Sequence, residues 1–292
     1  MVTEELILVN GKKLPLFIFM PRSGSTILFE AASSYAINNL GMISLGRNSE
    51  IFNRFMTDQV SLDTRTEVQK TLELFTLNNK NPQLPMTLHG VNPNIFGSSR
   101  EAVIHKIKVL MKERERGFEH YIKIASSSFY QAPDEIMDLY KDRKFVLIRS
   151  KNLHDTALSL LYSKYTNLWH ARSSNWHTWE LAADEPVSIH TGLVETIWRE
   201  IKVYRNMDHW EHKLSERGYD YNVVYKEDLI SWDHICSEID KIYETNEWRS
   251  YLTDDLLRSL PHKRKKDYKK LIKNYDQVSS LINERIREDF KL

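Results

Sequence analysis

The sequence predicts an α/β fold in which a parallel sheet lies between helices in three layers. Short apolar runs alternate with amphipathic segments along the chain, which is typical of strand-helix units around such a sheet. The chain has 292 residues, and 41% of them are hydrophobic, so it can bury a large core. We expect one domain over residues 1–292, with helical excursions at about 52–116 and 166–218.

The first strand is expected at Leu16–Met20, a short apolar run that ends at Pro21. A helix is expected from Ser25 to about Asn39, because its apolar residues recur at helical spacing and the following Asn-Asn-Leu-Gly sequence supplies a stop signal. The apolar stripe consists of Ile27, Leu28, Ala31, Ala32, Tyr35 and Ala36. The sequence therefore predicts a strand, a loop and a helix in this first unit.

Three further strands and their helices follow the same pattern. The expected strands are Tyr121–Ala125 (YIKIA), Lys144–Ser150 (KFVLIRS) and Tyr221–Tyr225 (YNVVY). Helices are expected at Pro133–Tyr140 and from about Leu153 to Tyr165, and another helical pattern opens at Glu227. Right-handed crossovers would place the loops Pro21–Thr26 and Ser150–Asp155 at the carboxyl edge of the sheet, where such sheets bind ligands.

Two excursions interrupt these units. Between Gly192 and Gly218, apolar residues recur at threes and fours, which indicates a helix packed against the core. Residues 52–116 contain the turn sequences Asn81-Pro82, Leu84-Pro85 and Asn92-Pro93, with helical stretches on either side. We expect this second segment to cover the functional site.

The charge balance and the cysteine count exclude several classes of protein. Lysine and arginine number 41 against 40 acidic residues, so no global basic field for nucleic acid is indicated. The single cysteine, Cys236, cannot form an intrachain disulfide, which fits a reducing compartment. The N-terminus is a poor secretory signal and no window approaches 18 apolar residues, so we expect a cytoplasmic protein without a membrane span. The oligomeric state is left open.

The loop Pro21–Thr26 (PRSGST) carries groups that bind an anion. Gly24 lets the backbone approach a ligand closely, and Arg22 can bind two oxygens at once. Hydroxyl donors are supplied by Ser23, Ser25 and Thr26. The nucleotide signature G-x-x-x-x-G-K-[ST] is absent, because no lysine follows Gly24. The structural alternative is a helix capped by Ser23 or Ser25, with Arg22 in solvent.

A second basic segment follows the strand Lys144–Ser150. The strand ends in Arg149 and Lys151, and the next helix carries Ser159. Enzymes that use a nucleoside triphosphate usually place an acidic residue near such a strand end to organise Mg²⁺. Two cations favour a second anion here, and no metal is expected. The structural alternative is an ordinary basic strand end and a serine on a helix face.

The two segments together resemble the sulfotransferases that use 3′-phosphoadenosine 5′-phosphosulfate (PAPS). PRSGST resembles the loop that holds the 5′-phosphosulfate, and KNLHDTALS resembles the 3′-phosphate segment if Lys151 takes the place of an arginine. Asp155 and Ser159 then fall in register. YNVVYKEDLI and DYKKLIKNYDQV resemble later elements of the same family. The resemblance covers the sheet skeleton and the C-terminal segment, about half of the chain.

The sequence also departs from that family. Arg22 stands where the cytosolic small-molecule branch usually has lysine, and it is more similar to the carbohydrate-modifying branches. The 3′-phosphate cation is either Lys151 or Arg149, two residues earlier. The Arg-Lys-Gly tail motif of the cytosolic branch is missing, and the basic run His262–Lys266 either replaces it in part or is solvated.

The resemblance implies a P-loop-like sulfotransferase fold, PAPS as donor, its bisphosphate PAP as product, and a small-molecule or glycan acceptor that presents a hydroxyl or amine. Arg22 would neutralise charge on the bridging oxygen. Glu50 is the implied general base, with His89 and His154 in reserve, although Glu50 alternatively decorates the next helix. The alternative functions are a P-loop nucleotide kinase or NTPase and a catalytically silent nucleotide-binding protein of the same fold.

Overall fold

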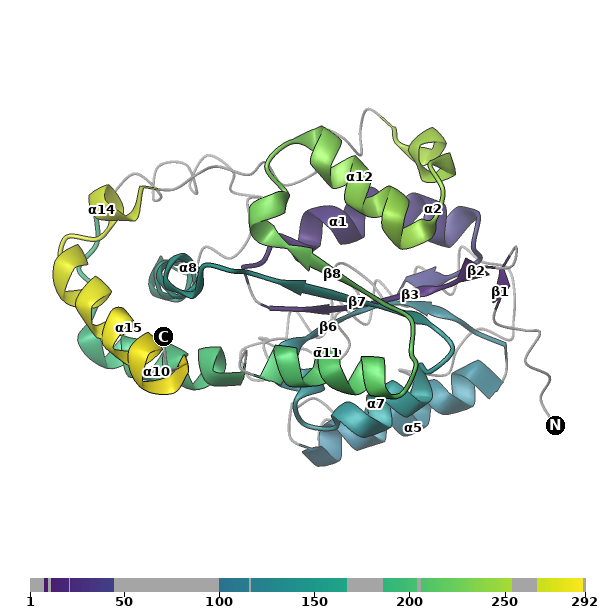
Figure 1. Ribbon diagram of the computed structural model, residues 1–292, viewed down its shortest axis with the longest axis horizontal. Coiled ribbons are helices and arrows are strands. Elements are labelled where there is room, and N and C mark those ends of the chain that lie inside the picture. Colours follow the sequence, from purple (N-terminus) through teal and green to yellow (C-terminus); the bar gives the residue numbers. More distant parts are fainter. Residues whose placement is uncertain are drawn as a thin grey trace, which may run out of the picture.

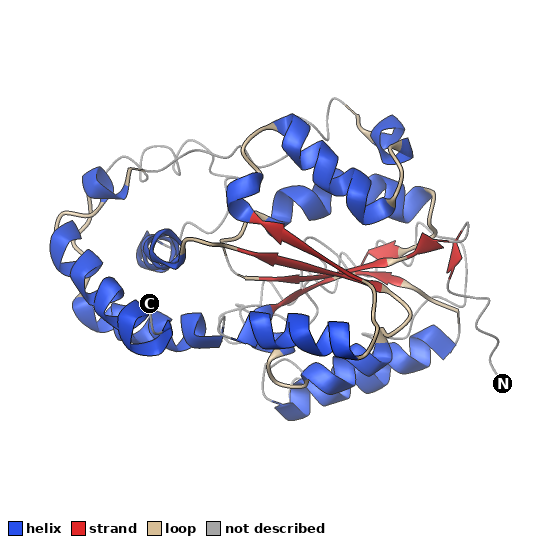
Figure 2. Ribbon diagram, viewed as in Figure 1, coloured by secondary structure: helices blue, strands red, loops and turns tan. Residues whose placement is uncertain are grey.

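The computed structural model describes residues 8–9, 12–20, 22–44, 100–115, 117–166, 186–203, 206–253 and 267–290. Four parallel strands form the central sheet in the order β6-β3-β7-β8 (Figure 1). They are β3 (Pro15–Phe19), β6 (Lys123–Ala125), β7 (Lys144–Arg149) and β8 (Tyr221–Tyr225). Helices lie on both faces of this sheet (Figure 2). The predicted α/β class and the four predicted strands are confirmed.

Strand β3 lies between β6 and β7 and is buried on both of its faces. Leu16 and Ile18 belong to one hydrophobic core, and Phe17 and Phe19 belong to the other. A strand that is covered on both sides needs an unbroken apolar run, which is what the sequence has here. The central strand thus divides the molecule into two cores.

Two helical layers cover these cores, and a third group of helices lies past the carboxyl ends of the strands (Figure 1). The core with Phe17 is covered by α1 (Ser25–Ala31), α2 (Ser33–Asn38) and α12 (Trp232–Tyr243). The opposite face carries α5 (Arg100–Glu115), α7 (Pro133–Leu139) and α11 (Asn206–Glu216). The third group, α8 (Leu153–Thr166), α10 (Thr191–Lys202) and α15 (Tyr275–Phe290), packs together.

Two helices predicted as continuous are each divided in the structure. The helix expected over residues 25–39 breaks at Ala32, which has φ −97° and ψ 1°. The stripe expected over residues 192–218 belongs to α10, which packs on α8 and α15, and to α11, which packs on β7 and β8. Periodicity shows which face of a segment is apolar, but it does not show which neighbour covers that face.

Short elements complete the described fold. The predicted strand Tyr121–Ala125 is also divided, because β5 (His120–Tyr121) pairs with β4 (Ile43–Ser44) while β6 pairs with β3. The remaining elements are β1 (Leu8–Val9), β2 (Lys12–Lys13), α6 (Ser126–Phe129), η4 (Lys226–Asp228), η5 (Glu247–Tyr251) and α14 (Tyr268–Leu271). None of the described helices combines the length and apolar character that a membrane crossing needs. Of the cover expected from residues 52–116, residues 52–99 lie outside the described residues, and α5 packs with α7 on one face of the sheet.

A buried cluster of charges lies at the amino edge of the sheet. Glu119 is held between Arg114, at 3.0 Å, and Arg143, whose side chain is fully buried. Arg143 also donates a hydrogen bond to the carbonyl of His120 at 2.7 Å. Burial alone would raise the pKa of Glu119, but the two guanidinium groups outweigh it and lower this pKa. Loss of one partner from such a buried pair costs about 3–5 kcal/mol, so the cluster is a strong structural constraint.

We predict that His120 makes the protein sensitive to acid. Its ring nitrogens are buried without a hydrogen-bond partner among the described residues, and burial, together with Arg143 and Arg114, lowers its pKa to about 3. The unfolded chain binds this proton below pH ~6.5, so stability should fall between about pH 6.5 and 3, by up to about 1.4 kcal/mol per pH unit. Urea unfolding against pH measures this loss. His120→Leu should flatten that range, and an unchanged slope in the variant would contradict the assignment.

Candidate active site

The two predicted anion loops lie at the point where the sheet connections diverge. From β3 the chain enters α1 on one face, and from β7 it enters α8, which packs into the core of the other face. β3 and β7 are adjacent, and the backbone N–H of Met20 donates to the carbonyl of Ile148 at 2.9 Å just where β3 ends. Open α/β sheets form their ligand crevices at such a switch point.

Arg22 and Ser159 meet at this point. The Nε–H of Arg22 donates a hydrogen bond to Oγ of Ser159 at 2.9 Å, across 137 residues of sequence. Arg22 has a left-handed backbone with φ 65°, an uncommon conformation for a side chain other than glycine. Burial lowers the pKa of the Arg22 guanidinium, and the nearby Tyr268 partly opposes that shift. The structure thus brings together a predicted residue of the first loop and one on the helix that follows the second loop.

The rest of the first loop is built around Gly24. This residue has φ 80° and occupies the N-cap position of α1, without a side-chain cap. A β carbon at Gly24 would lie 3.5 Å from Leu229, so the backbone conformation, and not crowding, is what favours glycine. Ser23 and Ser25 are buried, and Oγ of Ser23 has no hydrogen-bond partner among the described residues. Ser23 therefore does not cap the helix as the structural alternative required.

Lys123 is a cation near this loop that sequence reasoning missed. Its side chain is 1% exposed on β6, and its Nζ lies 3.2 Å from Oγ1 of Thr26. Its Nζ also lies 5.0 Å from the ring centroid of Phe19 and 5.6 Å from that of Phe29. The available signal was a lysine inside the apolar run YIKIA. Ser126, which directly follows β6, is another buried hydroxyl without a hydrogen-bond partner among the described residues.

Tyr268 brings the C-terminal segment to the same place. Burial raises the pKa of the Tyr268 phenol, while its hydrogen bond with Ser159 and the charge of Arg22 act in the opposite direction. The backbone next to Tyr268 pairs with the segment before α10: Val187 N–H donates to Leu271 at 2.9 Å, and Lys273 N–H donates to Val187 at 2.8 Å. This pairing holds α14 against the segment before α10.

The side chain of Asn274 fixes the same contact from the other side of the turn. Its Oδ1 accepts from the backbone N–H of Ile189 at 2.9 Å, and its Nδ2 donates to the Ile189 carbonyl at 2.8 Å. An amide that satisfies both backbone groups of one residue mimics a strand partner. The C-terminal segment is therefore tied to the chain just before α10.

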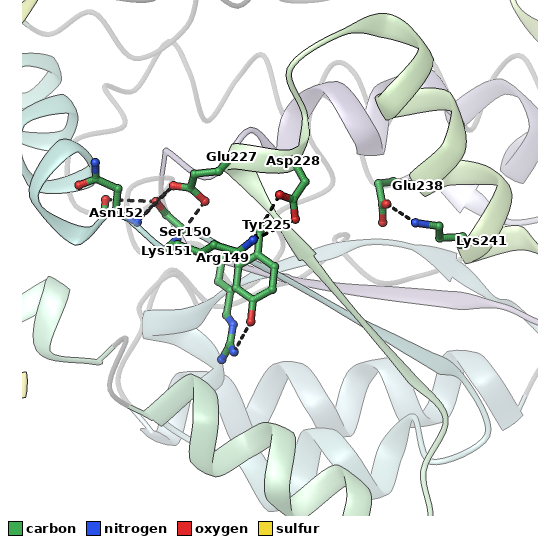
Figure 3. A network of polar contacts seen from close by, with 9 residues as sticks. All are labelled: Arg149, Ser150, Lys151, Asn152, Tyr225, Glu227, Asp228, Glu238 and Lys241. Carbon is green, nitrogen blue, oxygen red and sulfur yellow. Dashed lines mark hydrogen bonds and ion pairs between the residues drawn. The ribbon is translucent and has the colours of Figure 1, made fainter.

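Arg149 points away from the Arg22–Ser159 pair. It forms ion pairs with Asp208 and, at 3.2 Å, with Glu211 of α11, and it donates to the hydroxyl of Tyr225 at 2.7 Å (Figure 3 shows the Tyr225 contact). Burial alone would lower the pKa of Arg149, but Tyr225 and Asp208 outweigh it and raise this pKa. This predicted cation is already neutralised by the helix below the sheet.

Lys151 is more exposed and also has an acidic partner. Its Nζ lies 3.3 Å from a carboxylate oxygen of Asp228 and 4.3 Å from the ring centroid of Tyr225. Side-chain exposure is 54% for Lys151, against 14% for Arg149. Of the two predicted cations, Lys151 is the one that solvent reaches readily.

Glu227 lies in η4, after β8, and its side chain reaches the loop that connects β7 to α8. Its carboxylate accepts hydrogen bonds from Oγ of Ser150 at 2.5 Å, from the backbone N–H of Lys151 at 2.9 Å and from that of Asn152 at 3.2 Å (Figure 3). Burial alone would raise the pKa of Glu227, but these bonds outweigh it and lower the pKa. Sequence reasoning missed this role, although the acid stands directly after a predicted strand.

Of the three predicted bases, only His154 lies in the part of the chain that the structure describes. Glu50 and His89 lie outside the described residues. Nε2 of His154 lies 2.9 Å from Oγ of Ser279 on α15, and burial lowers the pKa of His154. Within the described ranges, no three side chains of the metal-binding types gather closely enough to hold an ion.

We predict that the Arg22–Ser159 bond stabilises the fold. Ser159→Ala should lower the free energy of unfolding by about 1–3 kcal/mol, because a charged donor loses its buried acceptor. Ser163→Ala is the matched control, since this hydroxyl is fully buried one turn further along α8 without a hydrogen-bond partner among the described residues. Urea denaturation should show little or no cost for the control. Equal costs for the two variants would contradict the prediction.

The described groups at this edge suit anion binding: Arg22, the hydroxyls of Ser23 and Ser126, and Lys123 gather near the ends of neighbouring strands. Two carboxylates at this edge are held within the chain: Glu227 accepts hydrogen bonds from the loop after β7, and Asp228 pairs with Lys151. No known family model and no curated protein sequence matches this chain.

Proposed function

We propose that this protein is a PAPS-dependent sulfotransferase that moves a sulfuryl group from PAPS to a hydroxyl or amine of an acceptor such as a carbohydrate. The observation that carries the proposal is the hydrogen bond between Arg22 and Ser159. It joins the two anion motifs, which lie far apart in sequence, at the switch point of a parallel sheet. The contact places the guanidinium of the first motif beside a hydroxyl of the second.

The residues at this edge fit a sulfated nucleotide. Oγ of Ser23 and Oγ of Ser126 are buried hydroxyl groups without hydrogen-bond partners among the described residues, and oxygens of a bound anion would satisfy them. Arg22 supplies a fixed positive charge in the first loop, and Lys123 supplies a buried one beside Thr26. The left-handed backbone at Gly24 suits close approach of a ligand to the main chain.

These side chains match what sulfuryl transfer requires. PAPS supplies the activated sulfuryl group, and the charge that develops during transfer collects on the bridging oxygen. Arg22 and backbone N–H groups of the loop would bind that oxygen. The acceptor must also lose a proton to a base. Glu50 remains the predicted base, with His89 in reserve and His154 in reserve on the nucleotide side.

Each of the two alternative functions has one observation in its favour. Glu227 and Asp228 bring carboxylates to the carboxyl edge, as a kinase or NTPase with Mg²⁺ would need, but Glu227 accepts three hydrogen bonds and Asp228 pairs with Lys151. The pairing of Arg149 and Lys151 with acids favours a silent nucleotide-binding protein. The nucleotide that binds tests the kinase or NTPase alternative. Transfer of the sulfuryl group tests the silent-protein alternative.

We predict that adenosine 3′,5′-bisphosphate stabilises the protein against heat and that ATP with Mg²⁺ does not. A ligand at 100 times its Kd adds about 2.7 kcal/mol to the folded state, which a thermal shift assay resolves. Adenosine 5′-phosphate serves as the control that lacks the second phosphate. No shift with the bisphosphate at millimolar concentration would exclude the sulfotransferase proposal, and a shift with ATP and Mg²⁺ alone would favour the kinase.

We predict that replacement of Arg22 reduces transfer far more than binding. Arg22→Gly removes the side chain but keeps a residue that suits φ 65°, so the loop should hold its shape. The rate of transfer of radiolabelled sulfate from PAPS to a panel of acceptors should fall about 10²–10³-fold, as for a lost oxyanion donor. Arg22→Ala should behave alike, whereas Arg22→Lys should keep part of the rate. A rate in Arg22→Gly equal to wild type would remove Arg22 from the reaction.

A further inference from the structure

Two backbone donors of the loop after β7, the N–H groups of Lys151 and Asn152, are satisfied from within the chain. Glu227 accepts from the N–H groups of Lys151 and Asn152 and from the hydroxyl of Ser150, which together face one carboxylate (Figure 3). These are the donors that a phosphate at this loop would otherwise use. To bind these donors, a phosphate would therefore have to displace the ionised carboxylate of Glu227 and break its three hydrogen bonds.

The Glu227 carboxylate also repels a phosphate that approaches this loop. A phosphate beside Glu227 would place like charges together without water between them, which is unfavourable for both. The hydrogen bonds that lower the pKa of Glu227 keep its charge in place near neutral pH. An anionic ligand at this edge is thus driven from the backbone toward a side-chain cation.

Lys151 is the cation that is placed to receive it. Arg149 is held by Asp208, Glu211 and the hydroxyl of Tyr225 and is mostly covered. Lys151 is more than half exposed, and Asp228 holds its ammonium at 3.3 Å. An exposed lysine-aspartate pair contributes little free energy, so a doubly charged phosphate can replace Asp228 at the ammonium.

We propose that Glu227 blocks the backbone donors after β7 and thereby assigns the second phosphate of the nucleotide to the Lys151 ammonium, for which Asp228 competes. This inference rests on the proposed nucleotide site and names the residues that set its selectivity. Neighbouring acids then act differently: Glu227 shapes the loop and directs the ligand, and Asp228 holds the cation until the ligand arrives.

The proposal predicts that removal of an acid tightens binding. Asp228→Asn should lower the Kd for adenosine 3′,5′-bisphosphate about two- to five-fold, because the competitor for Lys151 is an exposed ion pair. The Kd for adenosine 5′-phosphate, which lacks the second phosphate, should not change. Lys151→Ala should weaken binding of the bisphosphate, and Asp228→Asn should have no effect in that background. Isothermal titration calorimetry of the full chain measures all four proteins.

Asp233→Asn is the matched control for charge. It makes the same change of net charge at an exposed position on the first turn of α12, five residues further along the chain. Tightening by Asp233→Asn as large as that by Asp228→Asn would overturn the proposal, as would tightening that persists without Lys151. Equal affinity of wild type and Lys151→Ala would also overturn it and would move the second phosphate to Arg149.

The blocking role of Glu227 has a test without any ligand. Glu227→Gln keeps the size of the side chain, but it leaves only one oxygen to accept the hydrogen bonds that two carboxylate oxygens accept in the wild type. Hydrogen exchange of the Lys151 or Asn152 amide should become faster in this variant, while amides within β7 should not change. Unchanged exchange at both amides would overturn the blocking role. Absence of bisphosphate binding by wild type would instead overturn the proposed function and this assignment with it.

Discussion

The burial of β3 on both faces is the constraint on which the other features depend. A strand whose neighbours lie on both sides and whose two faces are apolar requires helices above and below it. The connections must then leave β3 and β7 toward opposite faces, and this divergence creates the edge where Arg22 and Ser159 meet. The site is in this sense a consequence of how the central strand is covered.

Charged groups are paired differently at the two edges of the sheet. At the amino edge, Arg143 and Glu119 are buried with each other, so their charges stabilise the fold. At the carboxyl edge, buried hydroxyls such as that of Ser23 lack hydrogen-bond partners among the described residues, and the cation of Lys151 pairs with the exposed carboxylate of Asp228. Buried hydroxyls without partners, placed where parallel strands end, suit a surface that binds a ligand.

The strands could be predicted because each is a short apolar run, and the shared edge of the two loops follows from parallel topology alone. Side-chain directions could not be predicted. Arg149 precedes Lys151 by two residues, yet only the structure shows that it turns to α11. Glu227 and Tyr268 were missed because their partners lie far away in sequence, where periodicity carries no information. Lys123 could have been noticed, since a charged residue within an apolar strand needs a compensating environment.

The pairing of Asn274 with Ile189 has a consequence for how the chain folds. This contact spans 85 residues, and it closes a loop between segments that leave the ribosome at different times. Long-range contacts form late because closing a long loop costs chain entropy before any contact is gained. The sheet and its first loop can assemble on the nascent chain, whereas Tyr268 reaches Ser159 only after the C-terminal segment has docked. The anion edge is therefore completed only after residues 267–274 have been synthesised and have docked.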